Sequence, residues 1–220
     1  MTLKAVLFDL DGVLLDTEGI YTDFWSSIDR RFPTGVDNFA AVIKGNTLTN
    51  ILATYFPDPD IQQQIHGLLI EQELSMPYRM FDGAMSLVAG LHAMGIHTAV
   101  VTSSTLKKMQ NVFRTLPDFE AAIDTLVTDE DVTVSKPDPQ GYLMAAERLG
   151  ASDGSFIVVE DSMAGLEAGR RSGAFVVGIA TTNPMDTVAP ACDLAVNAIA
   201  ELSPQILVDT FEKARVRFRS

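Results

Sequence analysis

Short apolar runs alternate along the chain with longer segments of helical periodicity. The runs "AVLF", "TAVV", "FIVV" and "FVVGI" are almost wholly apolar and rich in β-branched residues, which is typical of strands covered on both faces. The predicted strands are Ala5–Phe8, His97–Val101, Thr125–Val127, Phe156–Val159, Phe175–Ile179 and Leu194–Val196. The predicted helices between and after them are Ala84–Met94, Leu106–Leu116, Pro139–Leu149, Met163–Arg171 and Pro204–Phe218. This alternation predicts an α/β fold with a parallel sheet and helices on both of its faces.

One long region departs from this alternation. From about Thr17 to Arg79 the pattern is helical only, with breaks at Pro33–Gly35, Gly45–Asn46 and Pro57–Pro59. More than sixty residues therefore separate the first two strands, which is too long for a simple crossover. We predict an α/β core formed by residues 1–15 and 80–220, with a small helical domain of residues 16–79 inserted after the first strand.

Composition narrows the classes of partner. The chain has 220 residues, of which 47% are hydrophobic and 20% charged, as is usual for a globular protein. Its net charge of −13 disfavours nonspecific attraction to nucleic acid or to an anionic membrane. No signal-peptide pattern and no apolar run of about 18 residues is found, and the single cysteine, Cys192, allows no intrachain disulfide. We expect a cytoplasmic monomer that binds neither nucleic acid nor membrane.

Polar side chains follow four of the predicted strands at the point where each strand ends. In chain order these are Asp9 and Asp11; Thr102, Ser103 and Ser104; Lys136 in the loop after the third strand; and Glu160 with Asp161. Ligands of open parallel sheets bind beyond the carboxyl ends of the strands, so we expect these side chains to meet at one edge.

These residue types suit a site for phosphoryl transfer. Asp9, Glu160 and Asp161 could hold Mg²⁺, which prefers hard oxygen ligands and would relieve the repulsion among these carboxylates. Thr102 and the amides after it could bind phosphate oxygens, and Lys136 would balance the negative charge.

The two aspartates after the first strand could divide the chemistry between them. Asp9 could attack phosphorus as a covalent nucleophile, and Asp11 could protonate the leaving oxygen and later activate water. Each segment alone also has a simpler explanation. Asp-x-Asp-Gly often forms a turn, Thr102–Ser104 could cap the following helix, and Lys136 could be a solvated loop residue.

Taken together, the segments "DLDGVLLDT", "VVTSS", "SKPDP" and "VVEDSMAGLEAG" resemble the haloacid dehalogenase superfamily, in particular its β-phosphoglucomutase-like phosphatase branch. The resemblance implies a Rossmann-like core and a mobile helical cap that closes over the site. It implies four roles: Asp9 as nucleophile, Asp11 as acid and base, Thr102 as phosphate binder and Lys136 as charge-balancing lysine. It also implies that Mg²⁺ is held by Asp9, the Asp11 carbonyl and Asp161, with Glu160 bound directly or through water.

Three residues of the insertion are further candidates for substrate contact. Asp16 could instead cap the first helix or lie at the hinge, and Tyr21 could pack against Trp25, four residues further on. Lys44 could be a loop lysine near a phosphosugar. A Schiff-base role for Lys44 is a weaker alternative.

The resemblance leaves two activities open. Sugar-phosphate mutases of this branch carry a histidine where Tyr21 stands and an arginine where Leu48 stands. A mutase must hold a bisphosphate intermediate, which is harder without that arginine. We therefore predict a Mg²⁺-dependent phosphatase of a small phosphorylated metabolite, with a sugar phosphate preferred and a β-phosphoglucomutase-type mutase as the alternative. A dehalogenase would not need Asp11, and a binding-only domain would be expected to lack one of the four segments.

Overall fold

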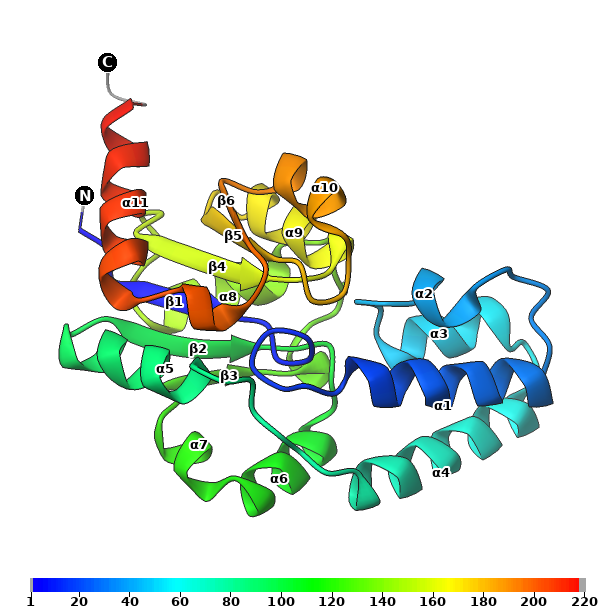
Figure 1. Cartoon of the computed structure of the whole chain (residues 1–220). Coiled ribbons are helices and arrows are strands. Elements are labelled where there is room, and N and C mark those ends of the chain that lie inside the picture. Colours follow the sequence, from blue (N-terminus) through cyan, green and yellow to red (C-terminus); the bar gives the residue numbers. More distant parts are fainter. Residues whose placement is uncertain (1, 218–220) are drawn as a thin grey trace.

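A computed structural model describes residues 2–217 of the chain and shows a parallel sheet of six strands (Figure 1). The strands are β1 (Ala5–Phe8), β2 (His97–Val101), β3 (Thr125–Val127), β4 (Phe156–Glu160), β5 (Phe175–Ile179) and β6 (Leu194–Val196). Their order across the sheet is β3-β2-β1-β4-β5-β6, and all five pairings are parallel. The predicted α/β fold is confirmed. Strand β4 is one residue longer than predicted because Glu160 pairs with Gly178 of β5.

Helices cover both faces of this sheet. They are α5 (Ala84–Ala93), α6 (Leu106–Thr115), α7 (Pro117–Ala121), α8 (Gln140–Arg148), α9 (Met163–Arg171), α10 (Met185–Val188) and α11 (Pro204–Arg217), with short 3₁₀ turns at Asp129–Asp131, Ala189–Ala191 and Ile199–Glu201. Side chains alternate along a strand, so Val6 and Phe8 of β1 pack with α5, α6, α7 and α11, whereas Ala5 and Leu7 pack with α8 and α9. The last predicted helix included Phe218, which lies outside the described residues. Within residues 2–217, no helix has both the length and the apolar character required to cross a membrane.

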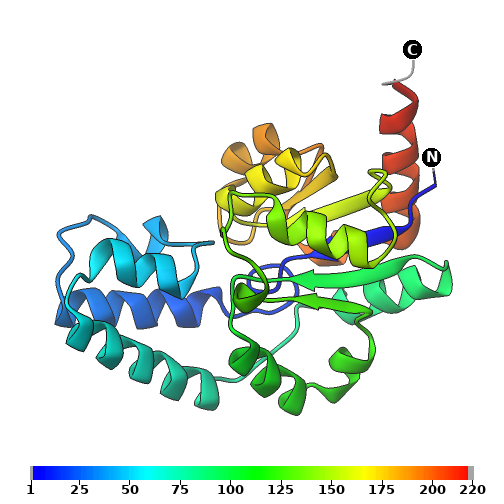
Figure 2. The ribbon, with the colours of Figure 1, turned by 180° about the vertical axis from the view of Figure 1, so that it is seen from behind.

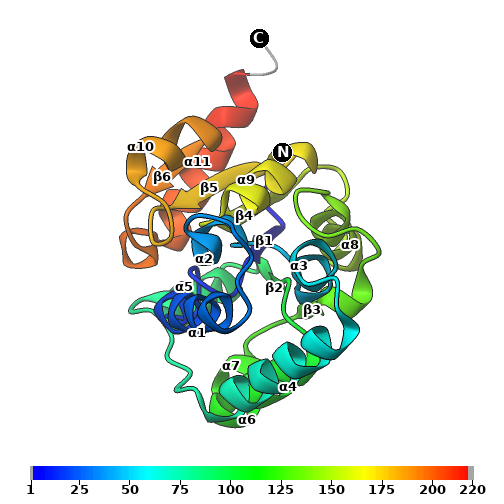
Figure 3. The same ribbon diagram turned by 90° about the vertical axis from the view of Figure 1, so that its right-hand side faces the viewer.

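Residues 16–79, all of them described, contain α1 (Glu18–Arg31), α2 (Phe39–Val42), α3 (Leu48–Tyr55) and α4 (Pro59–Ser75). These helices enclose an apolar cluster of their own, which includes Trp25 and Phe39 with ring centroids 6.1 Å apart. Seen from behind and from the side, the four helices lie beyond the carboxyl ends of the strands (Figures 2 and 3). We refer to them as the α1–α4 segment. That it forms a separate domain of residues 16–79 stays a prediction.

The two connections of the α1–α4 segment run side by side. The backbone N–H of Asp16 donates to the carbonyl of Arg79 at 2.9 Å, and Leu15 forms an antiparallel bridge with Met80. The chain therefore leaves the sheet and returns to it at the same place, beside the end of β1.

Candidate active site

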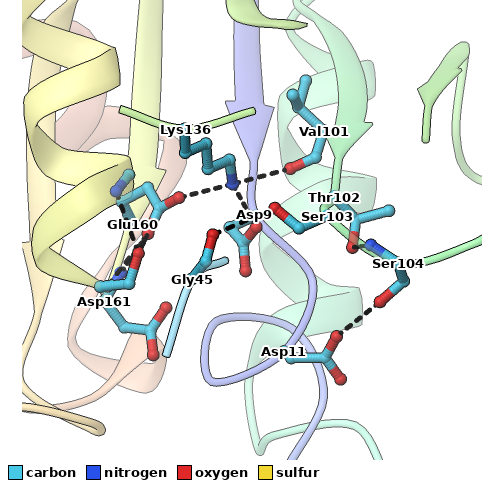
Figure 4. Close-up of polar contacts among 12 residues, drawn as sticks. Asp9, Asp11, Gly45, Val101, Thr102, Ser103, Ser104, Lys136, Glu160 and Asp161 are labelled. Atoms are coloured by element: carbon cyan, nitrogen blue, oxygen red, sulfur yellow. Dashed lines mark hydrogen bonds and ion pairs between the residues drawn. The ribbon is translucent and has the colours of Figure 1, made fainter. Parts of the chain in front are cut away.

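The candidate site lies at the carboxyl edge of the sheet, where the strand order reverses on either side of β1. Asp9 directly follows β1, Thr102 follows β2 and Asp161 follows β4. Parallel neighbours that end at the same level deliver the residues after them to one place, and Figure 4 shows these side chains gathered there. This edge beside the reversal is where ligands bind in open parallel sheets.

One lysine ammonium links the ends of three strands. Lys136 Nζ lies 2.5 Å from Asp9 Oδ1, 2.7 Å from Glu160 Oε1 and 3.2 Å from the carbonyl of Val101 (Figure 4). The Lys136 side chain is 8% exposed and that of Glu160 is fully buried. Removing a charge from water costs several kcal/mol, so a buried charge requires partners such as these to offset the cost. The structure therefore brings Lys136 to Asp9 across 127 residues of sequence and to Glu160 across 24.

Burial and neighbouring charges shift the pKa values of the ionisable groups in the site in opposing directions. Burial raises the pKa of Asp9 to about 7, although the charge of Lys136 opposes this rise. Burial, together with the charges of Glu160 and Asp9, also raises the pKa of Asp161 well above its ordinary value. Burial alone would lower the pKa of Lys136, but Asp9 and Glu160 raise it instead, so its ammonium stays charged. One ammonium does not neutralise three carboxylates, and the site favours a further cation.

The residues present fit a divalent metal. One oxygen from each of Asp9, Glu160 and Asp161 can be chosen so that all lie within 4.8 Å of one another. Asp161 Oδ1 is buried without a hydrogen-bond partner among residues 2–217, whereas Asp161 Oδ2 accepts from the hydroxyl of Thr182. An unpaired buried carboxylate oxygen is rare and requires an explanation, which a bound cation would supply.

Gly12 allows the chain to pass close to this cluster. Its φ of +82° lies in the left-handed region, and a Cβ placed on it would stand 2.0 Å from Asp161 Oδ2. A side chain at this position would displace the carboxylate.

Glu160 differs from the other two carboxylates because both its oxygens are already engaged. Oε1 accepts from Lys136 and, at 2.8 Å, from the hydroxyl of Tyr142. Oε2 accepts from the backbone N–H groups of Asp161 and Ser162, each at 3.0 Å, and from the Ser162 hydroxyl at 3.1 Å. A direct bond from Glu160 to a metal would have to displace one of these donors.

The loop after β2 presents hydroxyl groups to the site. Thr102 Oγ1 accepts from the N–H of Ser104 at 3.1 Å, and the Ser103 hydroxyl donates to the carbonyl of Gly45 at 3.3 Å. The helix that follows is capped by Thr105, whose hydroxyl accepts from the N–H of Lys108. The alternative explanation of Thr102–Ser104 as the cap of this helix is therefore wrong.

A cavity separates this edge of the sheet from the α1–α4 segment. Its sheet side includes Asp9, Asp11 and residues 102–105, and its other side includes Tyr21, Lys44 and Leu48. Tyr21 donates its hydroxyl to Glu73 Oε1 at 3.0 Å, and Lys44 pairs with Glu18 at 2.7 Å.

The structure does not bring Asp16 to this cavity. Its side chain is exposed, and its backbone belongs to the paired connections described above. Asp16 therefore contacts no substrate in this cavity and does not cap α1, whose N-cap is Thr17; it lies at the connection where a hinge was predicted.

Three residues of the site were not found from the sequence. Thr182 comes shortly after β5 and could have been found by the same rule of strand ends. Tyr142 and Lys108 lie on helices, where nothing in the sequence marks them as polar partners of the site. Lys108 Nζ lies 2.5 Å from Asp11 Oδ2.

Comparison with known proteins agrees with this geometry. A family model described as haloacid dehalogenase-like hydrolase matches residues 3–173. Validoxylamine A 7'-phosphate phosphatase from Streptomyces hygroscopicus subsp. limoneus is 32% identical over 196 residues, which are 86% of this chain and 91% of that protein. β-Phosphoglucomutase from Bacillus subtilis is 26% identical over 230 residues, which are 98% of each chain.

A solved structure shows the same fold. The haloacid dehalogenase hydrolase of family IA, variant 3, from Entamoeba histolytica superposes with a TM-score of 0.79 at 24% identity, and the match covers 96% of this chain and 100% of that one.

Proposed function

The chain belongs to the haloacid dehalogenase-like hydrolase family, and from this premise we propose that it is a Mg²⁺-dependent phosphatase acting on a small phosphorylated metabolite. The observation that carries the proposal is the contact of Lys136 with both Asp9 and Glu160 beside the unpaired oxygen of Asp161. It combines a half-buried carboxylate that can act as nucleophile, a fixed positive charge and a partly formed cation site within one edge of the sheet.

We assign the metal ligands from the donors that remain free. Asp9 and Asp161 would hold Mg²⁺, together with the backbone carbonyl of Asp11 as the family resemblance implies. Glu160 would contribute through water because its oxygens accept five hydrogen bonds. When bound, the ion supplies positive charge beside the phosphoryl oxygens and neutralises the carboxylates.

The protein's own residues then divide a two-step displacement. A carboxylate oxygen of Asp9 forms a bond to phosphorus while the bond to the leaving oxygen breaks, and Asp11 gives that oxygen its proton. In the second step Asp11 takes a proton from water, the water oxygen binds phosphorus, and the bond to Asp9 breaks to release phosphate. Thr102 holds a phosphoryl oxygen throughout. Lys136, whose three N–H groups are already engaged, supplies fixed positive charge beside it.

The lining of the cavity supports a single phosphoryl group on the substrate. Lys44 is the one cation among the described residues that line the cavity, and its charge is already paired with Glu18. Leu48 lines the same wall and offers no charge. A second phosphate, as in the bisphosphate intermediate of a mutase, would lack a free cation there. Similarity to a validoxylamine 7'-phosphate phosphatase supports a sugar-like phosphate. The alternative, a phosphosugar mutase, is supported by the similarity to β-phosphoglucomutase.

A product analysis tests the assignment. The protein is incubated with Mg²⁺ and a panel of sugar and polyol monophosphates, and free phosphate is measured. We expect release that needs Mg²⁺ and is abolished by EDTA and by Asp9→Asn. With β-glucose 1-phosphate and a bisphosphate primer, we expect at most free phosphate; efficient formation of glucose 6-phosphate would establish the mutase instead. Phosphate release by the Asp9→Asn protein in EDTA would refute both.

A further inference from the structure

Both carboxylate oxygens of Asp11 are held by neighbouring side chains. Oδ1 accepts from the hydroxyl of Thr17, and Oδ2 accepts from Ser104 Oγ at 3.1 Å and from Lys108 Nζ at 2.5 Å. Thr17 lies at the start of α1, whereas Ser104 precedes α6 and Lys108 lies within it. Two separate parts of the fold therefore fix the orientation of this one side chain.

Lys108 is an unusual residue at this position because its side chain is 1% exposed. Its ammonium also donates to Ser104 Oγ at 2.9 Å and lies 4.6 Å from the centre of the Tyr21 ring. Lysine is almost never fully buried unless it is paired, and the only ion pair found for Lys108 among residues 2–217 is with Asp11. Lys108 does not line the cavity, so it acts on the site through Asp11 and not by contact with a substrate.

We propose that Lys108 is a positioning residue that holds Asp11 for proton exchange with the substrate; this inference rests on the acid and base role of Asp11 in the proposed function. An ammonium has donors only, so Oδ2 facing Lys108 remains an acceptor. Lys108 and Ser104 together hold Oδ2, whereas Oδ1 is held by the single hydroxyl of Thr17, so loss of the Lys108 ammonium removes the strongest of the three contacts that orient Asp11.

The contact also connects Asp11 to the α1–α4 segment. The Lys108 ammonium lies over the ring of Tyr21 of α1, whose hydroxyl donates to Glu73 of α4. The placement of Asp11 thus depends on helices from both sides of the cavity. A displacement of about 1 Å at a reacting group can lower a rate about 100-fold, so loose anchoring of Asp11 would be costly for turnover.

The chain offers a matched pair of variants. Lys108→Met removes the ammonium but keeps most of the side-chain length, and Lys107→Met removes the same charge from the exposed neighbouring residue of α6. With a phosphomonoester that the wild type hydrolyses, we expect Lys108→Met to lower kcat by about 10- to 100-fold with KM changed less than about threefold. Lys107→Met is expected to keep kcat within about twofold of the wild type.

A double-variant cycle with Asp11→Asn separates positioning from general structural damage. If Lys108 acts through Asp11, Lys108→Met has no further effect on the residual rate of Asp11→Asn, because contacting residues are not additive when one acts through the other. If Lys108→Met lowers that residual rate by its full factor, or behaves like Lys107→Met in the otherwise wild-type protein, the inference is overturned.

The proposed function fails in a different way. If Asp11→Asn is as active as the wild type, or if the wild type releases phosphate from no monoester, Asp11 has no acid and base role to position. If Lys108→Met does not fold, as judged by thermal unfolding, the cycle is repeated with Lys108→Arg, whose larger head group shifts Asp11 while keeping the charge. In the protein that retains Asp11, we then expect Lys108→Arg to lower kcat at least about tenfold, and in the Asp11→Asn protein we expect no further loss. An equal loss in both proteins would overturn the inference.

Discussion

Replacement of Gly165 by alanine tests the packing on which the site depends. Gly165 lies in the first turn of α9, and a Cβ placed there would stand 1.7 Å from Glu160 Oε1 and 1.9 Å from its Cδ. No heavy-atom contact of this length is tolerated, so the Glu160 carboxylate must move away. It would then lose its bonds to Lys136 and Tyr142, which are buried with it.

The two consequences of this substitution oppose each other. Glycine to alanine within a helix stabilises by about 0.5–1 kcal/mol. Disruption of one partner in a buried ion pair destabilises by about 3–5 kcal/mol. The loss of the ion pair outweighs the gain in helix stability, so we expect Gly165→Ala to lower the free energy of unfolding by about 2–4 kcal/mol.

Gly67 provides the matched control. It lies in α4, is exposed, and no atom stands within 4 Å of a Cβ placed on it. Gly67→Ala should therefore raise the free energy of unfolding by about 0.5–1 kcal/mol.

Thermal unfolding of both variants measures the difference. At this chain length we expect Tm to fall by about 5–15 °C for Gly165→Ala and to rise by about 1–4 °C for Gly67→Ala. Phosphatase activity should fall in Gly165→Ala only. If Gly165→Ala raises Tm as Gly67→Ala does, the contacts assigned to Glu160 are wrong.

Further outcomes follow from the same carboxylates. Asp9→Asn should lower phosphate release by at least about 1000-fold without a large fall in Tm, because it removes the nucleophile; activity near that of the wild type would exclude a covalent role. Burial raises the pKa of Asp9 from 3.8 to about 7 in the protein without metal, so the folded state binds this proton more tightly than the unfolded chain does. The contribution of Asp9 to stability therefore falls as pH rises from about 4 to 7. A divalent cation offsets this loss, and the rise in Tm on adding Mg²⁺ should be larger at pH 8 than at pH 5. Equal rises at both pH values would contradict a metal site at Asp9.

The sequence predicted the sheet well because its strands are buried on both faces. Continuous apolar runs such as Phe175–Ile179 leave little ambiguity, and five of the six strands have the predicted bounds. The rule of strand ends then found Asp9, Thr102 and Asp161, because local position along the chain decides where these residues lie.

Other features of the site depend on how helices are rotated against the sheet and on contacts between distant segments, which a local sequence pattern does not encode. Lys107 and Lys108 are identical neighbours, and only the rotation of α6 against the sheet buries the second of them. The run "TSST" offers four consecutive residues suited to cap a helix, so the choice of Thr105 required the backbone path. The five donors around Glu160 come from the loop at Lys136, from Tyr142 of α8 and from the turn after β4, so no single segment of the sequence indicates them.

The paired connections at Asp16 and Arg79 make the α1–α4 segment exchangeable. Because backbone hydrogen bonds from Asp16 to Arg79 and from Phe81 to Leu14 pair the two connections, a segment of different length or shape can be spliced between them without shifting the register of any strand. A different segment joined there would replace the far wall of the cavity, and it would have to supply its own partners for Asp11 and Lys108 in place of Thr17 and Tyr21. For protein engineering, the same junction marks where a foreign segment could be grafted to redirect this chemistry to another substrate.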